Sequence, residues 1–522
     1  MSNSARATWI LLSGMAIYVA IAAYYMPYLT DDALISLRYA ERFAQGDGLT
    51  WNDGYYVEGY SNFAWVVLLG GLIKLGVGPI FALRLLGAFF VGAVAIAGLR
   101  LTARSAAPFA ASLLLVLVMA VHPLWIWTIA GLETPLVVAC IFFALLALDK
   151  WWQSERENSG SLWLASAILA LLTLTRPDAP LFTVAAAFLP LFGSEPFAVR
   201  IRNAIILVSL PLMAFALQMG FRLYYYGDWV PNTARVKVAL NEGRLRSGAK
   251  YVLSAIYVAS AGVAIIGALA LWRPRQRPAA FWLALFMGGI WAGYIVVIGG
   301  DHFPGLRHLP PTIAALAAAM VIARNDAPVA WLDAAMRRAP VIALMVAVLV
   351  MAGYTIMQAR YDWNARVHTR SFVWSCQEVA QDMYDQFNES DPMIAVTAAG
   401  CLPYFTGFET LDLLGLNDLE IPKRKPEDFG KGWLGHELGD IDYVLERQPQ
   451  IIIFHMGEGP IFRYIDLIEY SDAFHQDYCE TAFESGGEQR KIFMQRSYRE
   501  KIGFAGLCEN DDRLSTQEQG QG

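Results

Sequence analysis

The chain has 522 residues, of which 56% are hydrophobic and only 16% are charged. Soluble proteins usually carry about a quarter charged residues, so the composition excludes an ordinary soluble globular protein. Apolar stretches fill residues 8–357 and charge returns in residues 359–522, which predicts one body in lipid and a second in water. The formal net charge is -6, and no basic run indicates a nucleic-acid partner.

The first apolar run extends from about Trp9 to Leu29 and follows a basic residue, Arg6. The run is too long for the core of a typical signal peptide, and no small-residue cleavage site follows it. We therefore expect a retained membrane span with the N-terminus in the cytoplasm.

Further apolar stretches follow, several of them short or interrupted by Gly and Pro. A helix needs about 20 residues to cross a bilayer, and twelve stretches approach that length. They are residues 9–29, 62–78, 80–99, 108–127, 133–149, 161–175, 179–193, 203–223, 251–272, 279–298, 310–323 and 339–357.

Lys and Arg collect in four short loops, which the positive-inside rule assigns to the cytoplasm. These loops lie near residues 150–156, 200–202, 273–277 and 324–338. Everything after residue 358 then faces the far side, which requires an odd number of crossings. We therefore expect eleven spans, with the failing candidate in region 62–131. Arg100 and Arg104 contradict strict alternation there, and His122-Pro123 can break residues 108–127 into a hairpin that does not cross.

The tail, residues 359–522, alternates helical and strand-like patterns. Ser375–Phe387 is typical of an amphipathic helix, and Met393–Thr397 and Ile451–His455 are typical of buried strands. This alternation predicts a small α/β domain on the outer side of the membrane. The last ~10 residues, rich in Gln, Gly and Ser, are expected to be disordered.

Four of the five cysteines, Cys376, Cys401, Cys479 and Cys508, lie in this tail. An even set in one domain favours two disulfides in an oxidising compartment, and the three possible pairings stay open. The alternative is four free thiols in a cytosolic domain. Cys140 lies in an apolar stretch and is expected to be a packing residue.

Two adjacent acids, Asp31 and Asp32, follow the first span and open a predicted interfacial helix. Thr30 is the expected N-cap, and Gly46 or Gly48 ends the helix. One carboxylate can accept a proton from an attacking hydroxyl while the other positions that base or the acceptor. The alternative is a pair of acids that only stabilise the start of the helix.

The segment that leads into the next stretch contains Glu58, Tyr60, Ser61 and Asn62. Glu58 and Tyr60 can line a sugar site, and Ser61 or Asn62 can cap the following helix. Interfacial aromatic residues beside a solvated acid are the alternative interpretation.

These segments occur in a recognisable order. Asp-Asp-Ala-x-Ile-Ser-x-Arg-Tyr-Ala starts at Asp31, followed by Gly-x-Gly-Leu-x-Trp-Asn and then Val-Glu-Gly-Tyr-Ser-Asn. The order resembles the first outer loop of membrane glycosyltransferases with the C-type glycosyltransferase fold, in particular the terminal arabinofuranosyltransferases of actinobacterial cell-wall assembly and their bacterial homologues. Later segments extend the resemblance over nearly the whole chain: Gly131–Thr134, Thr175–Asp178, Tyr226–Lys237, Gly299–Arg307, Asp412–Asp418 and Gly435–Glu437.

The resemblance implies a sugar donor on a polyprenyl phosphate, with the acidic pair as general base. It implies that Arg307, Lys237 and Arg176 bind the donor phosphate, because cations hold and stabilise a departing phosphate. The alternative is that each cation pairs with its own neighbour, such as Asp178 or Asp301. Other residues implied to bind substrate are Arg38, Glu58, Tyr60, Asn62, Glu133, Asp301 and His302; Glu133 can instead cap a span.

A metal is not expected, since His302, His436 and Glu437 are scattered ligands and a carrier with one phosphate has less need of a cation. A divalent metal stays open as the alternative. We therefore predict an inverting transferase of the bacterial inner membrane, without a cofactor. It transfers a sugar, by analogy arabinofuranose, to a cell-envelope glycan or another periplasmic acceptor. The alternatives are a mannosyl or aminoarabinosyl transferase of the same fold, or a lipid or glycolipid transporter. A transporter would carry its charges at the midplane and repeat its halves, and neither pattern is found here.

Overall fold

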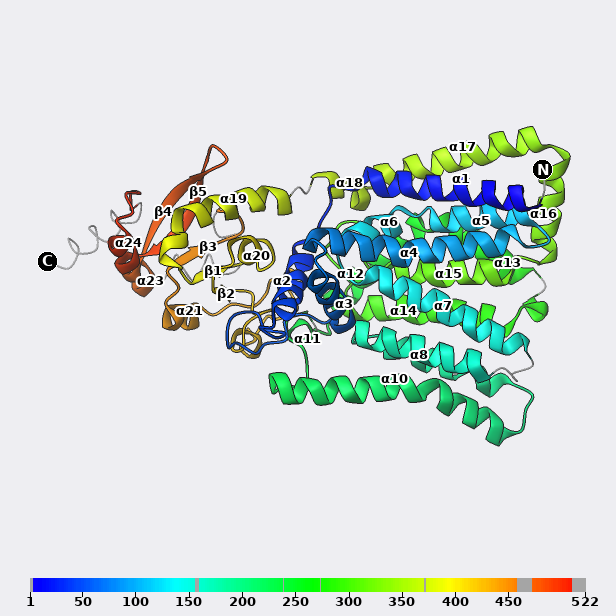
Figure 1. Ribbon diagram of the computed structural model, residues 1–522, viewed down its shortest axis with the longest axis horizontal. Coiled ribbons are helices and arrows are strands. Elements are labelled where there is room, and N and C mark those ends of the chain that lie inside the picture. Colours follow the sequence, from blue (N-terminus) through cyan, green and yellow to red (C-terminus); the bar gives the residue numbers. More distant parts are fainter. Residues whose placement is uncertain are drawn as a thin grey trace.

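The computed structural model describes residues 3–154, 159–237, 239–272, 274–369, 372–457 and 472–508. Long helices run side by side in a bundle, and a smaller body with a sheet lies at one end of it (Figure 1). The bundle contains α1 (Asn3–Tyr24), α4 (Pro79–Ala103), α5 (Pro108–Met119), α6 (His122–Ile129), α7 (Thr134–Gln153), α8 (Ser159–Thr175), α9 (Pro180–Ala187), η1 (Leu189–Phe192), α10 (Phe197–Tyr226), α13 (Ser260–Leu271), α14 (Ala279–Ile298), α15 (Pro310–Ile322) and α17 (Pro340–Arg360).

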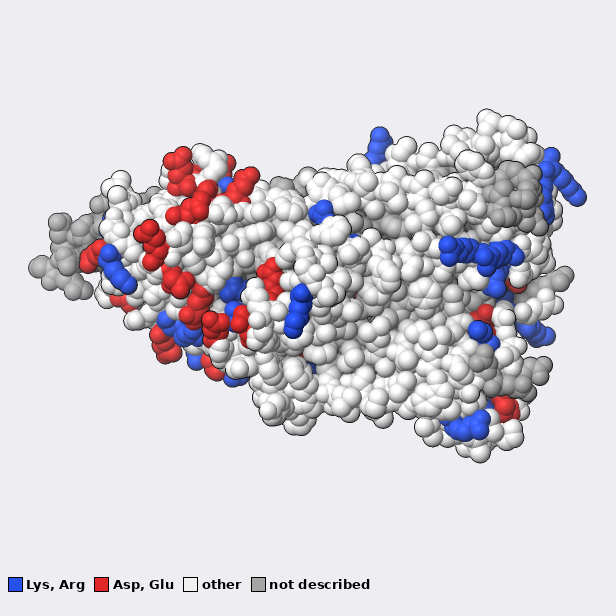
Figure 2. Space-filling model, in the orientation of Figure 1, with Lys and Arg blue, Asp and Glu red and all other residues white. Residues whose placement is uncertain are grey.

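The outer surface of the bundle is apolar. On α17, Val341, Leu344 and Leu349 are each more than 60% exposed. An exposed apolar face of this size is typical of contact with lipid. In Figure 2 a largely uncharged belt separates the end of the bundle near the N-terminus, where mainly Lys and Arg side chains gather beside a few acidic ones, from mixed charges on the C-terminal body. This distribution matches the basic cytoplasmic loops expected from the sequence.

Six helices among the described residues are long and apolar enough to cross a membrane, or up to nine if each of three bent pairs is one span. The bent pairs are α5 with α6, α12 (Glu242–Val258) with α13, and α15 with α16 (Ala327–Arg338), at 62°, 81° and 78°. The predicted break at His122 is present, but the chain bends there and does not reverse into a hairpin. The expected count of eleven is not confirmed by length and composition.

Short elements surround the junction between the bundle and the C-terminal body. They are α2 (Asp31–Gln45), α3 (Phe63–Lys74), α11 (Asn232–Lys237), α12 and α18 (Asp362–Thr369), while η2 (Pro274–Gln276) and α16 belong to the opposite end. Helix α3 packs tightly on α2, since a Cβ added to Gly70 would lie 2.9 Å from the carbonyl oxygen of Ala40.

Helix α2 lies between the bundle and the C-terminal body (Figure 1). All eight residues from Ala33 to Ala40 are buried, so this part of the helix is enclosed on every side, whereas an interfacial helix would bury one side only. Thr30 stands at the N-cap position without capping the helix, because its hydroxyl donates to the carbonyl oxygen of Ala130 at 3.1 Å. Gly46 ends the helix as predicted, at a φ of 100°.

The C-terminal body contains a five-stranded sheet of order β2-β1-β3-β5-β4. Strands β1 (Ile394–Val396), β2 (Thr410–Asp412) and β3 (Ile451–Ile453) are parallel, and β4 (Tyr478–Ser485) and β5 (Glu488–Gln495) form an antiparallel hairpin. The helical elements are α19 (Phe372–Phe387), η3 (Asn388–Ser390), α20 (Cys401–Thr406), η4 (Ile421–Lys423), α21 (Ile441–Arg447), α23 (Asp472–Asp477) and α24 (Arg496–Ile502). The predicted helix and both predicted strands are confirmed. The end of the chain, expected to be disordered, lies outside the described residues.

The four tail cysteines form two disulfides, Cys376–Cys401 and Cys479–Cys508, and Cys140 is free and buried. The first disulfide joins α19 to the start of α20, and α20 is the element that contacts α2. The observed pairing therefore fixes α20, whose first amides bind Asp31, to α19 within the C-terminal body.

Replacing both Cys376 and Cys401 by Ser is expected to lower the stability of the C-terminal body by about 2–4 kcal/mol, because the unfolded chain gains conformational freedom. Thermal unfolding followed by the protease resistance of this body measures the effect. Cys140→Ser is the control and should leave the resistance of the C-terminal body unchanged. Equal midpoints for the double variant and the control would show that the disulfide does not stabilise this body.

Candidate active site

Two pockets meet at the first turn of α2. The inner pocket, about 170 Å³, lies against the bundle, and the outer chamber, about 540 Å³, lies against the C-terminal body. The inner pocket is lined by residues that include Asp32, Ser36, Tyr60, Asn62, Glu133, Arg176, Asp178, Lys237, Tyr294, Arg307 and His308. The outer chamber is lined by residues that include Asp31, Asp32, Lys237, His302, Phe303, Thr397, Asp412, Trp433, His436 and His455. Asp32 and Lys237 line both cavities.

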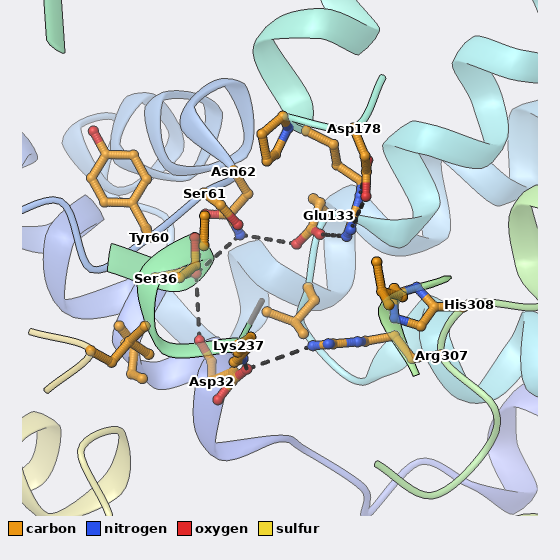
Figure 3. A pocket seen from close by; sticks show the side chains of 18 of the residues that line it. Asp32, Ser36, Tyr60, Ser61, Asn62, Glu133, Asp178, Lys237, Arg307 and His308 are labelled. Carbon is orange, nitrogen blue, oxygen red and sulfur yellow. Dashed lines mark hydrogen bonds and ion pairs between the residues drawn. The ribbon is translucent and has the colours of Figure 1, made fainter. Parts of the chain in front are cut away.

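The carboxylate of Asp32 lies between two cations (Figure 3). Its Oδ2 is 3.5 Å from Nζ of Lys237 and 3.6 Å from Nη1 of Arg307. Nε of Arg307 also contacts Oδ2 of the buried Asp301 at 2.5 Å. Burial disfavours the charged form of Asp32, but Lys237 and Arg307 outweigh it and hold the pKa of this carboxyl below its usual value.

Asp31 points the other way, into the C-terminal body. Its two carboxylate oxygens accept the amide N–H groups of Gly400, at 2.9 Å, and Cys401, at 2.7 Å. These amides belong to the start of α20, so Asp31 clamps α2 to that helix. Burial, together with the charge of Asp32, raises the pKa of Asp31 to about 7. The acidic pair is therefore divided between a carboxylate that opens into both pockets and one that is engaged by backbone.

A second polar chain runs along the wall of the inner pocket (Figure 3). Asn62 donates to Glu133 at 3.0 Å, and Arg176 donates to Glu133 at 2.6 Å. Arg176 also makes two hydrogen bonds to Asp178, at 2.8 and 2.7 Å. Asn62 does not cap α3 as expected, because its Oδ1 accepts from the hydroxyl of Ser36 at 3.4 Å while its amide N–H donates to the buried Glu133. Arg176 is thus already shared between two carboxylates, as the alternative interpretation of this residue predicts.

Lys237 ends α11, a short helix held from two sides. The side chain of Asn232 donates to the carbonyl oxygen of Asp418 at 2.7 Å and to that of Leu416 at 3.2 Å. Its backbone N–H donates to the carbonyl oxygen of Glu58 at 3.1 Å. The first outer loop and the C-terminal body therefore fix the position of Lys237 jointly.

Arg38 and Glu58, both expected to bind substrate, line neither cavity. The buried guanidinium of Arg38 donates to the carbonyl oxygens of Trp51 and Phe408, each at 3.0 Å, and to that of Pro403. Glu58 forms a buried ion pair with Arg222. Both side chains hold the outer loop in place, because their polar groups are taken up by protein partners.

The remaining predicted residues lie at or near the pockets. Tyr60 lines the inner pocket while its hydroxyl contacts that of Tyr226 at 3.0 Å. Asp301 lies behind Arg307 and lines neither cavity. His302 lines the outer chamber, where burial lowers its pKa to about 4.

Several lining residues were not selected from the sequence. Asp412 accepts the N–H groups of Leu414 and Asn417 at 3.0 and 2.8 Å, and burial raises its pKa to about 6. The Asp412–Asp418 segment was part of the family resemblance, which was the available signal. The sequence gives no signal for Trp433 and His308, because each side chain is brought to the site only by the folding of its loop.

No group of three or more His, Cys, Asp or Glu side chains that could hold a metal is found in the described ranges. The rings of His302 and His436 are 5.2 Å apart, centroid to centroid. Glu437, the third scattered candidate, instead pairs with Arg244 at 2.5 Å and accepts the N–H of Gly430 at 3.0 Å. This pair fastens the 430–437 loop to α12.

The fold is similar to two solved structures of ArnT from Cupriavidus metallidurans. The apo structure aligns with a TM-score of 0.52 over 93% of this chain and 97% of that one, at 14% identity. The structure bound to undecaprenyl phosphate aligns with a TM-score of 0.52 over 93% and 98%, at 15% identity. The protein has the ArnT fold.

Sequence comparison finds two curated relatives, each named terminal beta-(1->2)-arabinofuranosyltransferase. The Mycobacterium tuberculosis protein is 26% identical over 293 residues, covering 53% of this chain and 42% of the relative. The Corynebacterium glutamicum protein is 27% identical over 356 residues, covering 61% and 51%. The chain thus spans about half the length of these relatives. The resemblance drawn from the sequence motifs is confirmed. Residues 359–501 match a family described as "Domain of unknown function (DUF8728)".

Replacing Asp31 by Asn tests the clamp between α2 and α20. Because the pKa of Asp31 is raised to about 7 in the folded protein, its contribution to stability is greatest at low pH and declines as pH rises from about 4 to about 7. The melting temperature of the native protein relative to Asp31→Asn should therefore fall across this window. Asp47→Asn, at an exposed carboxyl beyond the same helix, is the control. A melting-temperature difference that does not change with pH would contradict the buried clamp.

Proposed function

We propose that this protein is a membrane glycosyltransferase that moves a sugar from a polyprenyl phosphate to an acceptor hydroxyl. The observation that carries the proposal is the single carboxylate of Asp32, which opens into two cavities and lies between Lys237 and Arg307. An acid held between cations at the meeting of two pockets suits a general base beside an anionic leaving group.

The donor is assigned to the inner pocket. This cavity reaches the ends of the bundle helices at Tyr294 and Ile298, so a lipid tail in the membrane can deliver its phosphate there. The ArnT structure with undecaprenyl phosphate and the two arabinofuranosyltransferase names support a polyprenyl-phosphate carrier with arabinofuranose as the sugar. The cations gather at one end of the bundle, which favours transfer over transport across the membrane.

The proposed reaction is a single displacement. The acceptor oxygen attacks the anomeric carbon while the bond from that carbon to the phosphate oxygen breaks. The acceptor proton passes to Asp32, and the bonding electrons leave with the polyprenyl phosphate, which Lys237 and Arg307 stabilise. One displacement inverts the anomeric configuration. Arg176 is a weaker candidate for the phosphate, because Glu133 and Asp178 already compensate its charge.

Donor binding should make Asp32 a stronger base. Without donor, Lys237 and Arg307 depress the pKa of Asp32. A phosphate that takes up these cations weakens their pull on the carboxylate and adds a negative charge nearby, and both effects raise the pKa of Asp32. The proton acceptor is thus activated when the sugar is in place.

We propose that residues 1–358 form the membrane domain and residues 359–522 an outer domain, with the N-terminus in the cytoplasm of a bacterial cell. Eleven crossings follow if α3 is the candidate that does not cross. It packs on α2 at the junction with the C-terminal body, and its 12 residues extend only about 18 Å, against the ~30 Å of a hydrocarbon core. Helix α4 then runs inward, which brings Arg100 to the cytoplasmic end and removes the conflict in the charge pattern.

Asp32→Asn is expected to reduce transfer by about 10²–10⁴-fold, the range that general-base catalysis contributes. Lys237→Met should raise the KM for donor, and Arg235→Met on the same helix is the matched control, since Arg235 pairs with Asp228 away from both cavities. The assay supplies polyprenyl-phosphoryl arabinofuranose to the purified protein in lipid and measures glycoside formation. Full transfer by Asp32→Asn would rule out this base.

Labelling with a membrane-impermeant thiol reagent tests the topology. A cysteine at Leu75, 82% exposed after α3, should react from the outer side, because α3 does not cross. A cysteine at Gln276, exposed between α13 and α14, should react only after the membrane is opened. Protection of position 75 in intact cells would mean that α3 crosses the membrane.

A further inference from the structure

The outer chamber is the larger of the two cavities, and the donor does not account for it. It lies between the start of α2 and the loops of the C-terminal body, which contribute Thr397, Asp412 and Trp433 to its walls. It adjoins the inner pocket at Asp32 and Lys237, with Ile35 and Leu416 also shared. A molecule in the chamber can therefore present a hydroxyl to Asp32 while a lipid phosphate occupies the inner pocket.

One wall of the chamber is aromatic. The rings of Trp433 and His436 stack at 4.9 Å with an angle of 20° between their planes. His302 meets Trp433 edge-on at 5.6 Å and stacks on Phe303 at 4.6 Å. Trp433 is 47% exposed, so part of its surface is accessible. Flat, partly exposed rings of this kind are suited to the apolar C–H face of a sugar, and the polar groups around them to its hydroxyls.

The charges on the walls have mainly one sign. Asp31, Asp32 and Asp412 line the chamber, and Lys237 is the single Lys or Arg among the lining residues that the structure describes. Lys237 is paired with Asp32, which leaves the carboxyl groups of Asp31 and Asp412. With a pKa of about 6 Asp412 is mostly ionised at neutral pH, and with a pKa of about 7 Asp31 is partly ionised. Burial lowers the pKa of His302 to about 4, so this ring brings no positive charge at neutral pH. The field in the chamber opposes anions, whereas the inner pocket adds Arg307, a cation that the outer chamber lacks.

We propose that the outer chamber binds the terminal residue of an uncharged saccharide acceptor, with Trp433 as its stacking surface, and that its carboxyl groups exclude acceptors carrying phosphate or carboxylate near the reacting hydroxyl. This inference rests on the proposed transferase activity and names its acceptor class. The two cavities then have opposite electrostatic preferences, an anionic donor on one side of Asp32 and a neutral acceptor on the other. Such repulsion is a means of selecting between partners that share the same hydroxyl.

The test uses the full-length protein in lipid nanodiscs with polyprenyl-phosphoryl arabinofuranose and two soluble acceptors. One is an octyl arabinofuranosyl disaccharide, and the other is the same disaccharide with a phosphate on a hydroxyl that does not react. We expect kcat/KM for the phosphorylated acceptor to be at least about tenfold lower at low salt. The gap should narrow at high salt, where charge repulsion is screened. Equal use of both acceptors at low salt would overturn the charge selection.

Variants test the position of the acceptor. Trp433→Ala should raise the KM for the neutral disaccharide at least about fivefold and leave the KM for donor unchanged. Trp331→Ala, in α16 at the opposite end of the bundle and 73% exposed, is the matched control and should change neither. An unchanged acceptor KM in Trp433→Ala would overturn the chamber assignment while leaving the proposed function intact. If neither acceptor supports release of polyprenyl phosphate by the native protein, the proposed function itself fails, and this inference with it.

Discussion

The structure depends on a partly buried charge cluster in which Asp32 is held by Lys237 and Arg307, with the buried Asp301 behind Arg307. The charges of the two carboxylates and the two cations cancel, which offsets the cost of removing them from water. The same balance makes the cluster responsive, because an incoming phosphate competes with Asp32 for both cations. We infer that Asp32 compensates the charges of Lys237 and Arg307 when no donor is bound. The donor phosphate can then replace Asp32 as their anionic partner, so the same two cations stabilise the empty site and bind the donor.

The C-terminal body completes this cluster. Asp31 accepts hydrogen bonds from the first amides of α20. Asn232 joins α11 to the 416–418 loop, and the ion pair of Arg244 and Glu437 holds the 430–437 loop beside the site. The parallel strands β1 and β2 end at Val396 and Asp412, so the loops that follow them open into the outer chamber. In our account the sheet is a scaffold that sets the distance between Lys237 and Asp32 and encloses the acceptor side.

Many features of the fold could be predicted because each depends on a short segment of the sequence. A single short segment carries the signal for each apolar stretch, for helix α19 and for strands β1 and β3, through its hydrophobic pattern. The end of α2 is signalled in the same local way by Gly46. The hydrogen-bond partners of Thr30 and Asn62 could not be predicted, since capping competes with tertiary partners, here Ala130 and Glu133, that lie about 70 to 100 residues away. For the same reason the division of labour between Asp31 and Asp32 stayed open: helix geometry treats two adjacent acids alike, and only the contact with α20 distinguishes them. Arg38, in α2, and Glu58, in the outer loop, resembled binding residues because of their places in the family motif. Their partners, distant carbonyl groups for Arg38 and Arg222 for Glu58, are set only by the fold.

The central claim is that the donor phosphate replaces Asp32 as the partner of Lys237 and Arg307. The most direct measurement is an experimental structure of the protein with polyprenyl phosphate bound in lipid. We predict the phosphate in the inner pocket, with its oxygens within hydrogen-bond distance of Nζ of Lys237 and of the Arg307 guanidinium, and with the Asp32 carboxylate released toward the outer chamber. A phosphate bound elsewhere, with Lys237 and Arg307 still on Asp32, would contradict it.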